Sequence, residues 1–516
     1  MNNDMQPNSN PTQFHDGDKL FADPILSGFG DFVRESARFF YADPKIHEKI
    51  AADQKIDALK AKHRRNALAN DEICRSTHLP GMTTGPVEAC SMCLGTGRPR
   101  IHPLVVFIFL MLRGRCGGSC DQTVRELILE SRSLEVALLP YVDHIPGATT
   151  ILENINCLQD STLEYIHRAF LKVALDEGLD DFSKLAVDST AIKAASAWPT
   201  DSKTIVDLCG RFLREEIKLE SWGLQRPGDA CCKRWWEQLQ ALHKSISMVG
   251  SGKGAKARRK QLYRDFFQIA CQLLSALLER YQNILQWQNS GGLEPYRGEL
   301  AACRIDALGE DVFNACTTLR HAVDRIEEIK MPKTRERVLG IADRAAAIIV
   351  KGGREPVIGY KPQLARTEQG MITVMQVDSG NPSDSACLEG VIKASIEAVS
   401  IVPAQVSADD GYSSLQGVNA VKELGVGEVS ISGAKGKRLL GEEAWELESM
   451  KELRAWRSSV ESVMFVLKHG YRFGQLGRRG IEAVRRELTE KVLAYNLERI
   501  LLLRRRKESK QIPKAA

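Results

Sequence analysis

The first third of the chain has the hydrophobic pattern of helices. Apolar residues recur at spacings of three and four in "DQTVRELILESRSLEVALL" and in "IPGATTILENINCL", where a Pro-Gly turn precedes the helix. The apolar run Leu104–Leu112 has nine residues, about half of what a membrane-spanning helix needs. We therefore expect a buried helix there, a polar disordered tail over 1–20, and a helical region over 21–180.

A strand and a long helical block follow. "KLAVDST" (184–190) predicts a short strand with an apolar centre. The pattern then returns to helix, and in "FFQIACQLLSALLERYQNIL" the apolar residues alternate steps of three and four, as in an amphipathic helix. We interpret 203–349 as a helical insertion.

Strands alternate with helices after Gly353. "PVIGYKPQLA" and "GMITVMQVD" predict two strands joined by a turn near Gln369 and Gly370, "SACLEGVIKASIEAV" predicts a helix, and "AQVSADDGY" and "GEVSISG" predict two more strands. Without the insertion, this order predicts an α/β fold with a mixed sheet. In such sheets, reactive side chains tend to lie where strands end.

The stretch "WRSSVESVMFVLK" (456–468) predicts one helix with two stripes. At about 100° per residue, four polar residues fall within an arc of roughly 60°: Arg454, Arg457, Glu461 and Lys468. Four apolar residues lie on the opposite side and are expected to pack on the sheet: Trp456, Val460, Val463 and Leu467. The polar stripe is as regular as the apolar one, which a solvated face with i,i+4 pairing would explain only in part.

Three acids stand at structurally distinct places. Asp188 ends the first strand, Asp409 ends a later one, and Glu461 lies on the late helix. Carboxylates from three elements could hold Mg²⁺ or Mn²⁺, and two such ions about 3.5–4 Å apart can activate an attacking oxygen and stabilise a leaving one. An Asp at a strand end is also a common turn or cap residue, and that alternative stays open for each acid.

Other acids are close in sequence to these candidates. Asp410 is the nearest substitute for Asp409, but alternation along "QVSADD" favours Asp409. Asp378 and Asp384 are rival acids that follow a strand; a turn role is favoured for both, and proximity to the site stays open.

Together these motifs carry a resemblance to a known family. Arg457, Glu461 and Lys468 read R-x3-E-x6-K, which resembles the Y-x2-R-x3-E-x6-K signature of bacterial insertion-sequence DDE transposases. "VDSTAIKAASAWPTDS" and "ADDGYSS" resemble the segments of their first and second aspartates, and "RRGIEAVRRELTEKVLAYNLERI" resembles their C-terminal helix.

The resemblance implies a fold and roles for these residues. It implies an RNase H-like catalytic core over 181–202 and 350–490, preceded by an all-α N-terminal DNA-binding region over 21–180. The resemblance does not extend to the helical insertion, which rests on the hydrophobic pattern, and the charge distribution indicates a basic C-terminal helix and tail over 491–516. Asp188, Asp409 and Glu461 would be the catalytic, metal-binding acids, with two Mg²⁺ or Mn²⁺ ions. Arg457 and Lys468 would hold DNA phosphates.

The sequence departs from the family pattern at two points. Arg454 stands where the signature has Tyr. The gap from Asp188 to Asp409 is far longer than that from Asp409 to Glu461, so the insertion lies before the second core strand, whereas some relatives carry theirs after the second aspartate.

The positive charge of the chain is concentrated at its C-terminal end. The net charge is +5 in 516 residues, but the segment from Lys491 onward has eight Lys or Arg and only two Glu. We expect DNA-phosphate contacts from Arg454 and from the tail residues Arg504, Arg505 and Arg506. The turn at Pro146-Gly147 and the helix after it are the first candidate for reading the DNA sequence.

Cysteine content and the N-terminal sequence bear on the compartment. Thirteen scattered cysteines favour reduced thiols. Cys90, Cys93, Cys116 and Cys120 could close a zinc site, but no His flanks them, and ordinary thiols are favoured. No basic segment followed by an apolar one opens the chain, so we expect a cytoplasmic, nucleoid-associated bacterial protein without a membrane partner.

The sequence thus predicts a transposase that binds the terminal inverted repeats of its element, cleaves DNA there and joins it to target DNA. Its partners would be double-stranded DNA and further copies of the chain, as a homodimer or higher oligomer. Two alternatives remain: an RNase H-like nuclease without strand transfer, and a non-catalytic, domesticated DNA-binding protein.

Overall fold

The described residues form two compact units. The structure, a computed structural model, describes 29–68, 100–118, 122–124, 135–136, 138–142, 144–195, 200–226, 230–290, 295–330, 343, 345–350 and 355–511. Within these ranges, one unit combines 29–66, 100–195 and 349–511, and the other consists of 67–68 and 200–348. The predicted tail 1–20, most of "DQTVRELILESRSLEVALL", and Cys90, Cys93 and Cys120 lie outside the described residues.

Helices make up the N-terminal part of the first unit. The described ones are α2 (Phe29–Ala42), α3 (Pro44–Leu68), α5 (Pro103–Cys116), α8 (Ala148–Asn156) and α9 (Asp160–Asp176). The α5 helix starts where the His102 side chain accepts a hydrogen bond from the Leu104 amide, and it ends at Gly117, whose φ is +64°. The predicted buried helix is confirmed, because 104–114 are buried. No helix among the described residues is long and apolar enough to span a bilayer.

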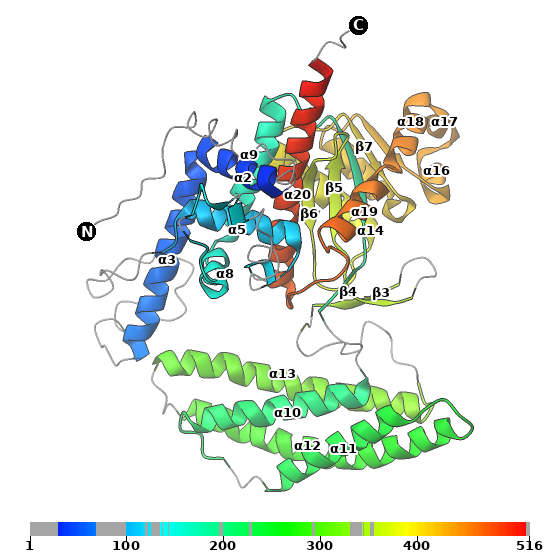
Figure 1. The fold of residues 1–516 in the computed structure, drawn as a ribbon. Coiled ribbons are helices and arrows are strands. Elements are labelled where there is room, and N and C mark those ends of the chain that lie inside the picture. The colour runs from blue at the N-terminus through cyan, green and yellow to red at the C-terminus, as the bar shows by residue number, and fades with distance from the viewer. Residues whose placement is uncertain are drawn as a thin grey trace, which may run out of the picture. The chain divides into compact units, whose positions relative to one another are not determined.

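A five-stranded mixed sheet forms the centre of the first unit (Figure 1). Its order is β6 (Ile372–Gln376), β5 (Gln363–Thr367), β1 (Lys184–Ser189), β7 (Gln405–Ala408) and β8 (Glu428–Ile431). The β5 strand is antiparallel to β1 and β6, whereas β1, β7 and β8 run parallel. A second sheet has the order β2 (Ile192–Lys193), β4 (Val357–Tyr360) and β3 (Ala347–Ile349).

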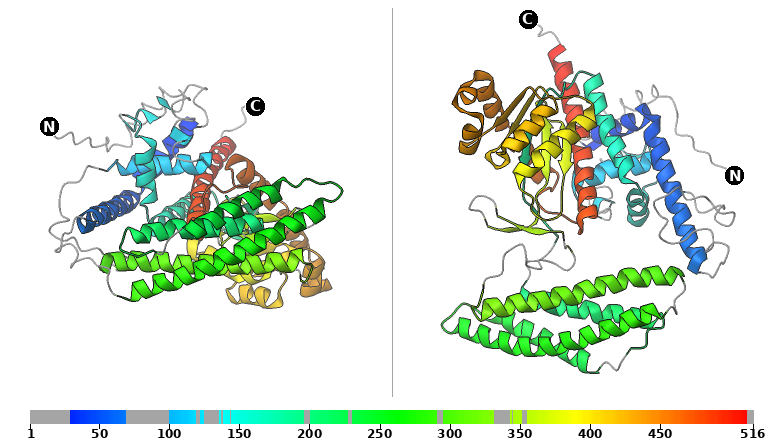
Figure 2. Two further views of the ribbon diagram at one scale, coloured as in Figure 1. Left: turned by 90° about the horizontal axis from the view of Figure 1, so that it is seen from below. Right: turned by 180° about the vertical axis from the view of Figure 1, so that it is seen from behind.

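Helices cover the two faces of the main sheet (Figures 1 and 2). On one face, apolar side chains such as Leu185, Val187 and Val406 form a core with α14 (Asp384–Val399) and α15 (Leu415–Glu423). The remaining elements of the core are η5 (Asp410–Tyr412), α16 (Ala434–Leu440), α17 (Glu442–Glu446), α18 (Glu448–Arg457), α19 (Val460–Gly470) and α20 (Ile481–Gln511). The α18 helix contacts β7 and β8, and α19 contacts β1.

The predicted strand "PVIGYKPQLA" is wrong in one respect. It forms two strands, β4 and β5, which belong to different sheets. Lys361 and Pro362 separate them, and a proline cannot donate to a strand ladder because it has no N–H. The predicted turn near Gly370 is present between β5 and β6, where φ of Gly370 is +86°.

The predicted helix 456–468 is also interrupted. The α18 helix ends at Arg457 and α19 begins at Val460. The hydroxyls of Ser458 and Ser459 donate to the carbonyls of Ala455 and Trp456, and such side-chain bonds to the preceding turn compete with the helical ladder. The polar stripe is therefore divided between two helices.

The apolar stripe packs only in part as predicted. Val460, Val463 and Leu467 are buried. Trp456 is half-buried, and its ring lies between the Lys184 ammonium, 4.7 Å from the centroid, and the Arg366 guanidinium, 4.9 Å away. Its role is thus a cation–π contact rather than an apolar one.

The long helix α20 joins the N-terminal helices to the sheet. It contacts α2, α5, α9 and β6. At the open edge of β6, the Asn496 side chain accepts from the Ile372 amide and donates to the Ile372 carbonyl, which also lies 2.9 Å from His167 Nε2. Helical side chains thus satisfy an edge that would otherwise be free to pair with another chain.

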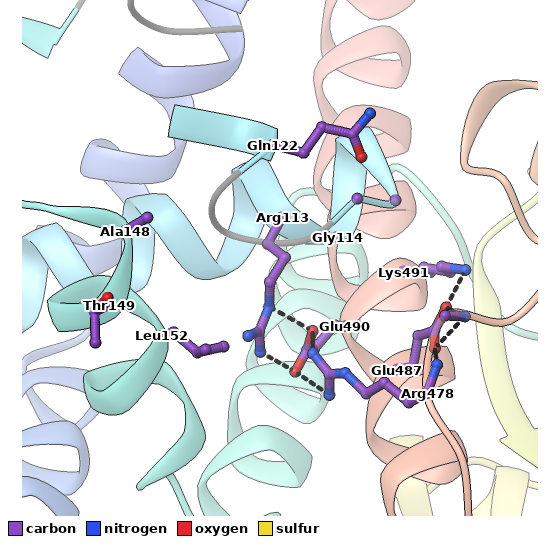
Figure 3. Close-up of a pocket in the computed structure, with 13 residues that line it drawn as sticks. Arg113, Gly114, Gln122, Ala148, Thr149, Leu152, Arg478, Glu487, Glu490 and Lys491 are labelled. Carbon is purple, nitrogen blue, oxygen red and sulfur yellow. Dashed lines mark hydrogen bonds and ion pairs between the residues drawn. The ribbon is translucent and has the colours of Figure 1, made fainter. Parts of the chain in front are cut away.

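A buried charge network lies where α5 meets α20 (Figure 3). The Glu490 carboxylate accepts hydrogen bonds from the guanidinium groups of Arg113 and Arg478, and both Arg113 and Glu490 are almost fully buried. These positive charges hold the pKa of Glu490 below its ordinary value although burial alone would raise it. The network borders a cavity of about 410 Å³.

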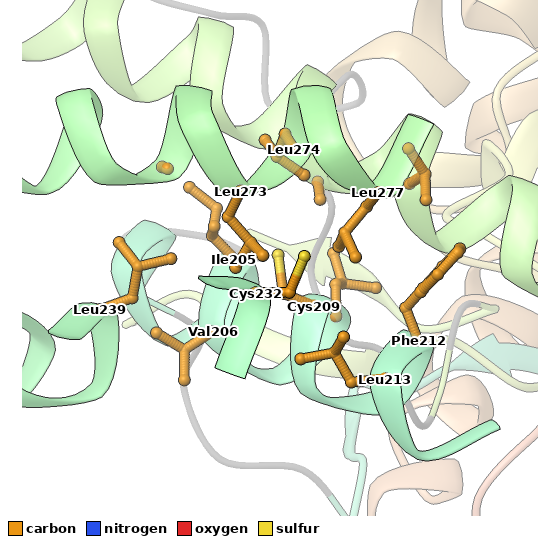
Figure 4. Packing of buried hydrophobic residues seen from close by; sticks show 14 of the residues in the cluster. Ile205, Val206, Cys209, Phe212, Leu213, Cys232, Leu239, Leu273, Leu274 and Leu277 are labelled. Carbon is orange, nitrogen blue, oxygen red and sulfur yellow. The ribbon is translucent and has the colours of Figure 1, made fainter. Parts of the chain in front are cut away.

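The second unit is a helical bundle (Figures 1 and 2). Its described helices are α10 (Asp201–Glu220), α11 (Ala230–Met248), α12 (Ala255–Asn289) and α13 (Pro295–Ile326). Figure 4 shows part of its core, in which Ile205, Leu239 and Leu273 interdigitate. The amphipathic pattern predicted for α12 is present, since Phe266, Leu277 and other positions three or four apart are buried.

We predict that Arg113→Met destabilises the first unit. It would leave the Glu490 carboxylate buried with one bidentate partner fewer, and breaking such a pair costs about 3–5 kcal/mol. Hydrogen exchange of peptides from α5 and α20 in increasing urea measures this. The control is Lys172→Met, which removes the exposed ion pair with Asp176. Equal effects of the two substitutions would contradict the importance of the network.

Candidate functional site

Two of the predicted acids lie at neighbouring strand ends. Val187 of β1 and Ala408 of β7 are register partners in the parallel pair. Asp188 is the next residue of β1, and Asp409 directly follows the end of β7. Asp188 is buried, and Asp409 is half-buried at the N-terminus of η5. The parallel register therefore brings these two acids to the same edge of the sheet.

The phenol of Tyr412 is close to this acidic edge. Burial raises the pKa of Tyr412, and the negative charges of Asp384, Asp188 and Asp409 raise it further. The Tyr412 hydroxyl donates to the Gln363 side-chain carbonyl. The phenol thus stays protonated and can serve as a hydrogen-bond donor among carboxylates.

Asp384 belongs to the same neighbourhood, a placement that the sequence left open beside the favoured turn role. A Cβ atom on Gly411 would lie 3.0 Å from Asp409 Oδ1 and 3.1 Å from Asp384 Oδ2. The two carboxylate oxygens are therefore no farther apart than the sum of these two distances. The Asp384 carboxylate also accepts from Gln363 Nε2 at 2.9 Å and pairs with Lys361 Nζ at 3.2 Å. The expected turn role misses this proximity, because Asp384 comes close to Asp409 only through the packing of α14 on the sheet.

Arg457 is a basic residue that lies close to Asp188. Its guanidinium is 3.9 Å from Asp188 Oδ2 and 3.4 Å from the Ser432 hydroxyl, which follows β8. The Nε of Arg457 is buried with no hydrogen-bond partner among the described residues. A cation therefore lies over the ends of β1 and β8, next to one of the acids.

Glu461 and Lys468 lie on α19. Glu461 is exposed in the first turn, and Lys468 is half-buried in the last turn. Among the described residues, no group of three or more His, Cys, Asp or Glu is arranged to hold a metal ion. The donor chemistry suits a hard divalent cation, but the acids do not form a metal centre in this arrangement, and the convergence of all three acids stays a prediction.

Asp410 has a different role from Asp409. Its Oδ1 accepts hydrogen bonds from the backbone amides of Lys435 and Gly436 at 2.9 and 3.0 Å, in the first turn of α16. Asp409 Oδ1 accepts a local bond from the Gly411 amide. The preference for Asp409 over Asp410 is thus supported by a structural function for its neighbour.

The other predicted DNA-binding arginines have partners within the protein. Arg454 stacks on the Trp445 ring at 3.8 Å and donates to its carbonyl. Arg504 pairs with Glu177 and Glu35, and Arg505 pairs with Asp31. Arg506 is exposed. Among these candidates, Arg506 is therefore the best placed to contact a phosphate.

The comparison with protein families bears on this arrangement. Residues 329–497 match the family described as "Transposase DDE domain". This part of the chain is similar to a transposase DDE domain. The comparisons with curated proteins and with solved structures gave no match.

The match to the DDE domain confirms the resemblance to insertion-sequence DDE transposases. Together with the mixed five-stranded sheet, it confirms the expected α/β fold with an RNase H-like core and helical regions. The matched range contains Asp409, Arg457, Glu461 and Lys468 but not Asp188. The DDE family implies nuclease or transposition activity and generally uses divalent metal ions.

We predict that substitutions of the adjacent acids Asp409 and Asp410 have different effects on the stability of α16. Asp410→Ala should destabilise the start of α16 by about 0.5–2 kcal/mol because two amides lose their acceptor. Asp410→Asn should be nearly neutral, since an amide oxygen can replace the carboxylate oxygen. Hydrogen exchange of 432–441 measures both, with Asp409→Asn as the control that leaves the α16 amides bonded. Increased exchange in Asp409→Asn alone would reverse the two roles.

Proposed function

We propose that the chain is the transposase of an insertion sequence, which binds the terminal inverted repeats of its element, cleaves DNA there and transfers the strand to target DNA. The main support is the placement of Asp188 and Asp409 at the ends of register-paired parallel strands, in a chain whose residues 329–497 match the transposase DDE domain family. Its partners would be double-stranded DNA and further copies of the chain, in the bacterial cytoplasm.

The residues of the site have complementary roles in this proposal. Asp188, Asp409 and Glu461 would hold two divalent ions, Mg²⁺ or Mn²⁺, which when bound activate the attacking oxygen and stabilise the leaving one. Arg457 and Lys468 would bind the phosphates of the DNA end. In the free protein the Arg457 guanidinium faces Asp188, so a phosphate would compete with that carboxylate for the same cation.

Sequence recognition is proposed for the helical region 21–180, with α8 as the first candidate. This helix follows Pro146-Gly147 and has no Lys or Arg, so its exposed polar side chains would have to read bases while other elements bind phosphates. Deletion of the region is not a clean test, because α5 and α9 contact α20. Substitution of the exposed Thr149 and Thr150 is the suitable one.

A strand-transfer assay tests the proposal. The substrate is a duplex with one of the terminal inverted repeats that flank the gene, mixed with a target plasmid and Mg²⁺ or Mn²⁺. A transposase produces joined products, because the freed 3′-OH attacks the target. Cleavage without joining would favour the nuclease alternative, and binding without cleavage would favour the domesticated DNA-binding protein.

We predict that Asp188→Asn abolishes cleavage and leaves DNA affinity nearly unchanged, since affinity comes mostly from basic contacts. Gel-shift and single-turnover cleavage assays on the same duplex measure both quantities. The matched control is Asp181→Asn, an exposed aspartate just before β1, which should cleave at the wild-type rate. Parallel loss of affinity and cleavage by a folded Asp188→Asn protein would indicate a structural role for Asp188.

Two arginines of the C-terminal helix should differ in their effect on DNA binding. Arg506→Gln should lower the slope of log affinity against log salt by about 0.9, the value for one lost phosphate contact. Arg504→Gln should leave the slope unchanged, because the Arg504 guanidinium pairs with Glu177 and Glu35. Binding titrations from low to high salt measure the slopes. An unchanged slope for Arg506→Gln would exclude the tail contact.

A further inference from the structure

A hydrogen-bonded chain of side chains crosses the acidic edge of the sheet. The Tyr412 hydroxyl donates to Gln363 Oε1, and Gln363 Nε2 donates to Asp384 Oδ1 at 2.9 Å. Lys361 Nζ lies 3.2 Å from the same Asp384 oxygen. Gln363 and Tyr412 are fully buried, so each has little freedom to exchange its partner for solvent.

This chain connects both strand ends that bear the proposed catalytic acids. Tyr412 is the last residue of η5, and its amide donates to the Asp409 carbonyl at 3.1 Å. Gln363 is the first residue of β5 and the register partner of Ser189, which directly follows Asp188. Gln363 is therefore linked to the ends of both strands: it is paired with Ser189 of β1, and its side chain binds Tyr412, which follows β7.

Asp384 completes the connection from the opposite side. It lies in the first turn of α14, and its Oδ2 comes as close to the Gly411 position as Asp409 Oδ1 does. A Cβ at Gly411 would contact both carboxylates at about 3 Å, a distance at which one neighbour has to shift. The η5 turn therefore lies against both the Asp409 and the Asp384 carboxylates.

We infer that Gln363, Asp384 and Tyr412 are positioning residues, which fix the orientation of Asp409 relative to Asp188 through the η5 turn. This inference rests on the proposed function, because it assigns these residues to the same reaction. They touch neither the scissile phosphate nor the reacting oxygens. Asp384 serves as a hydrogen-bond acceptor, so its acceptor oxygen is required and its negative charge is not.

Substitutions of Asp384 separate these two properties. Asp384→Ala removes the acceptor, and the turnover number should fall about 10–100-fold, the usual effect of a lost supporting hydrogen bond at a reactive centre. Asp384→Asn keeps an acceptor oxygen for Gln363 and Lys361, and it should restore turnover to within about threefold of wild type. The KM for the DNA end should be the same in all three proteins.

Substitutions of Gln363 and of Gln376, its register partner in β6, provide a matched comparison. Gln376 lies directly opposite Gln363 in the β5–β6 ladder and donates to Asp378 instead. Gln363→Leu should lower turnover as Asp384→Ala does, and the double variant should be no worse than either single one, because one chain is broken in each. Gln376→Leu should turn over at the wild-type rate.

The outcomes distinguish this inference from the proposed function. Normal turnover of Asp384→Ala and Gln363→Leu, in a wild-type background that cleaves DNA, overturns the inference alone. Loss of turnover in Asp384→Asn equal to that in Asp384→Ala overturns it too, since charge would then be the required property. A rise in KM or increased hydrogen exchange throughout the sheet would show a general loss of structure. No cleavage by wild-type protein overturns the proposed function together with the inference.

Discussion

The buried ion pair between Arg113 and Glu490 is the interaction on which the first unit depends. It joins residues that are 377 positions apart in sequence, and removing Arg113 would leave the buried Glu490 carboxylate with Arg478 as its remaining bidentate partner, a costly loss for a buried charge. The helices can approach closely because Gly114 has no side chain: a Cβ there would lie 2.2 Å from the Glu490 carbonyl. The N-terminal helices and the C-terminal helix therefore fold as parts of one core.

The position of α20 then determines how the sheet is completed. Because Arg113 fixes α20 against α5, Asn496 lies where it can satisfy both backbone groups of Ile372 at the sheet edge. After β6 the chain forms α14, whose first turn contains Asp384. Packing far from the acidic edge thus contributes to the geometry at that edge.

The two faces of the sheet differ in chemistry, and this difference concerns the site. The face under α14 and α15 is apolar. On the face under α18, the polar residues Arg366, Ser407 and Ser430 lie in one row across the strands, as the strand register shows. Each of the three has a buried polar atom without a partner among the described residues. Such atoms cost about 1–3 kcal/mol each, so the packing of α18 on this face is less favourable in polar terms than the apolar packing of α14 and α15 on the other.

The sequence by itself determined the α/β class, most strands of the five-stranded sheet and the buried helix α5, because alternation and apolar runs are local properties of the chain; it missed β2 and also β3, which lies inside the predicted helical insertion. It also indicated Asp188 and Asp409, since each follows a strand of recognisable pattern. It did not predict the break at Ser458 and Ser459, where hydroxyl groups compete with a helical pattern that is otherwise continuous. Only the tertiary structure decided the partners of charged residues, because Arg504 and Asp384 have sequence contexts typical of a basic tail and a turn, and only folding brings the acids and hydrogen-bond donors near them.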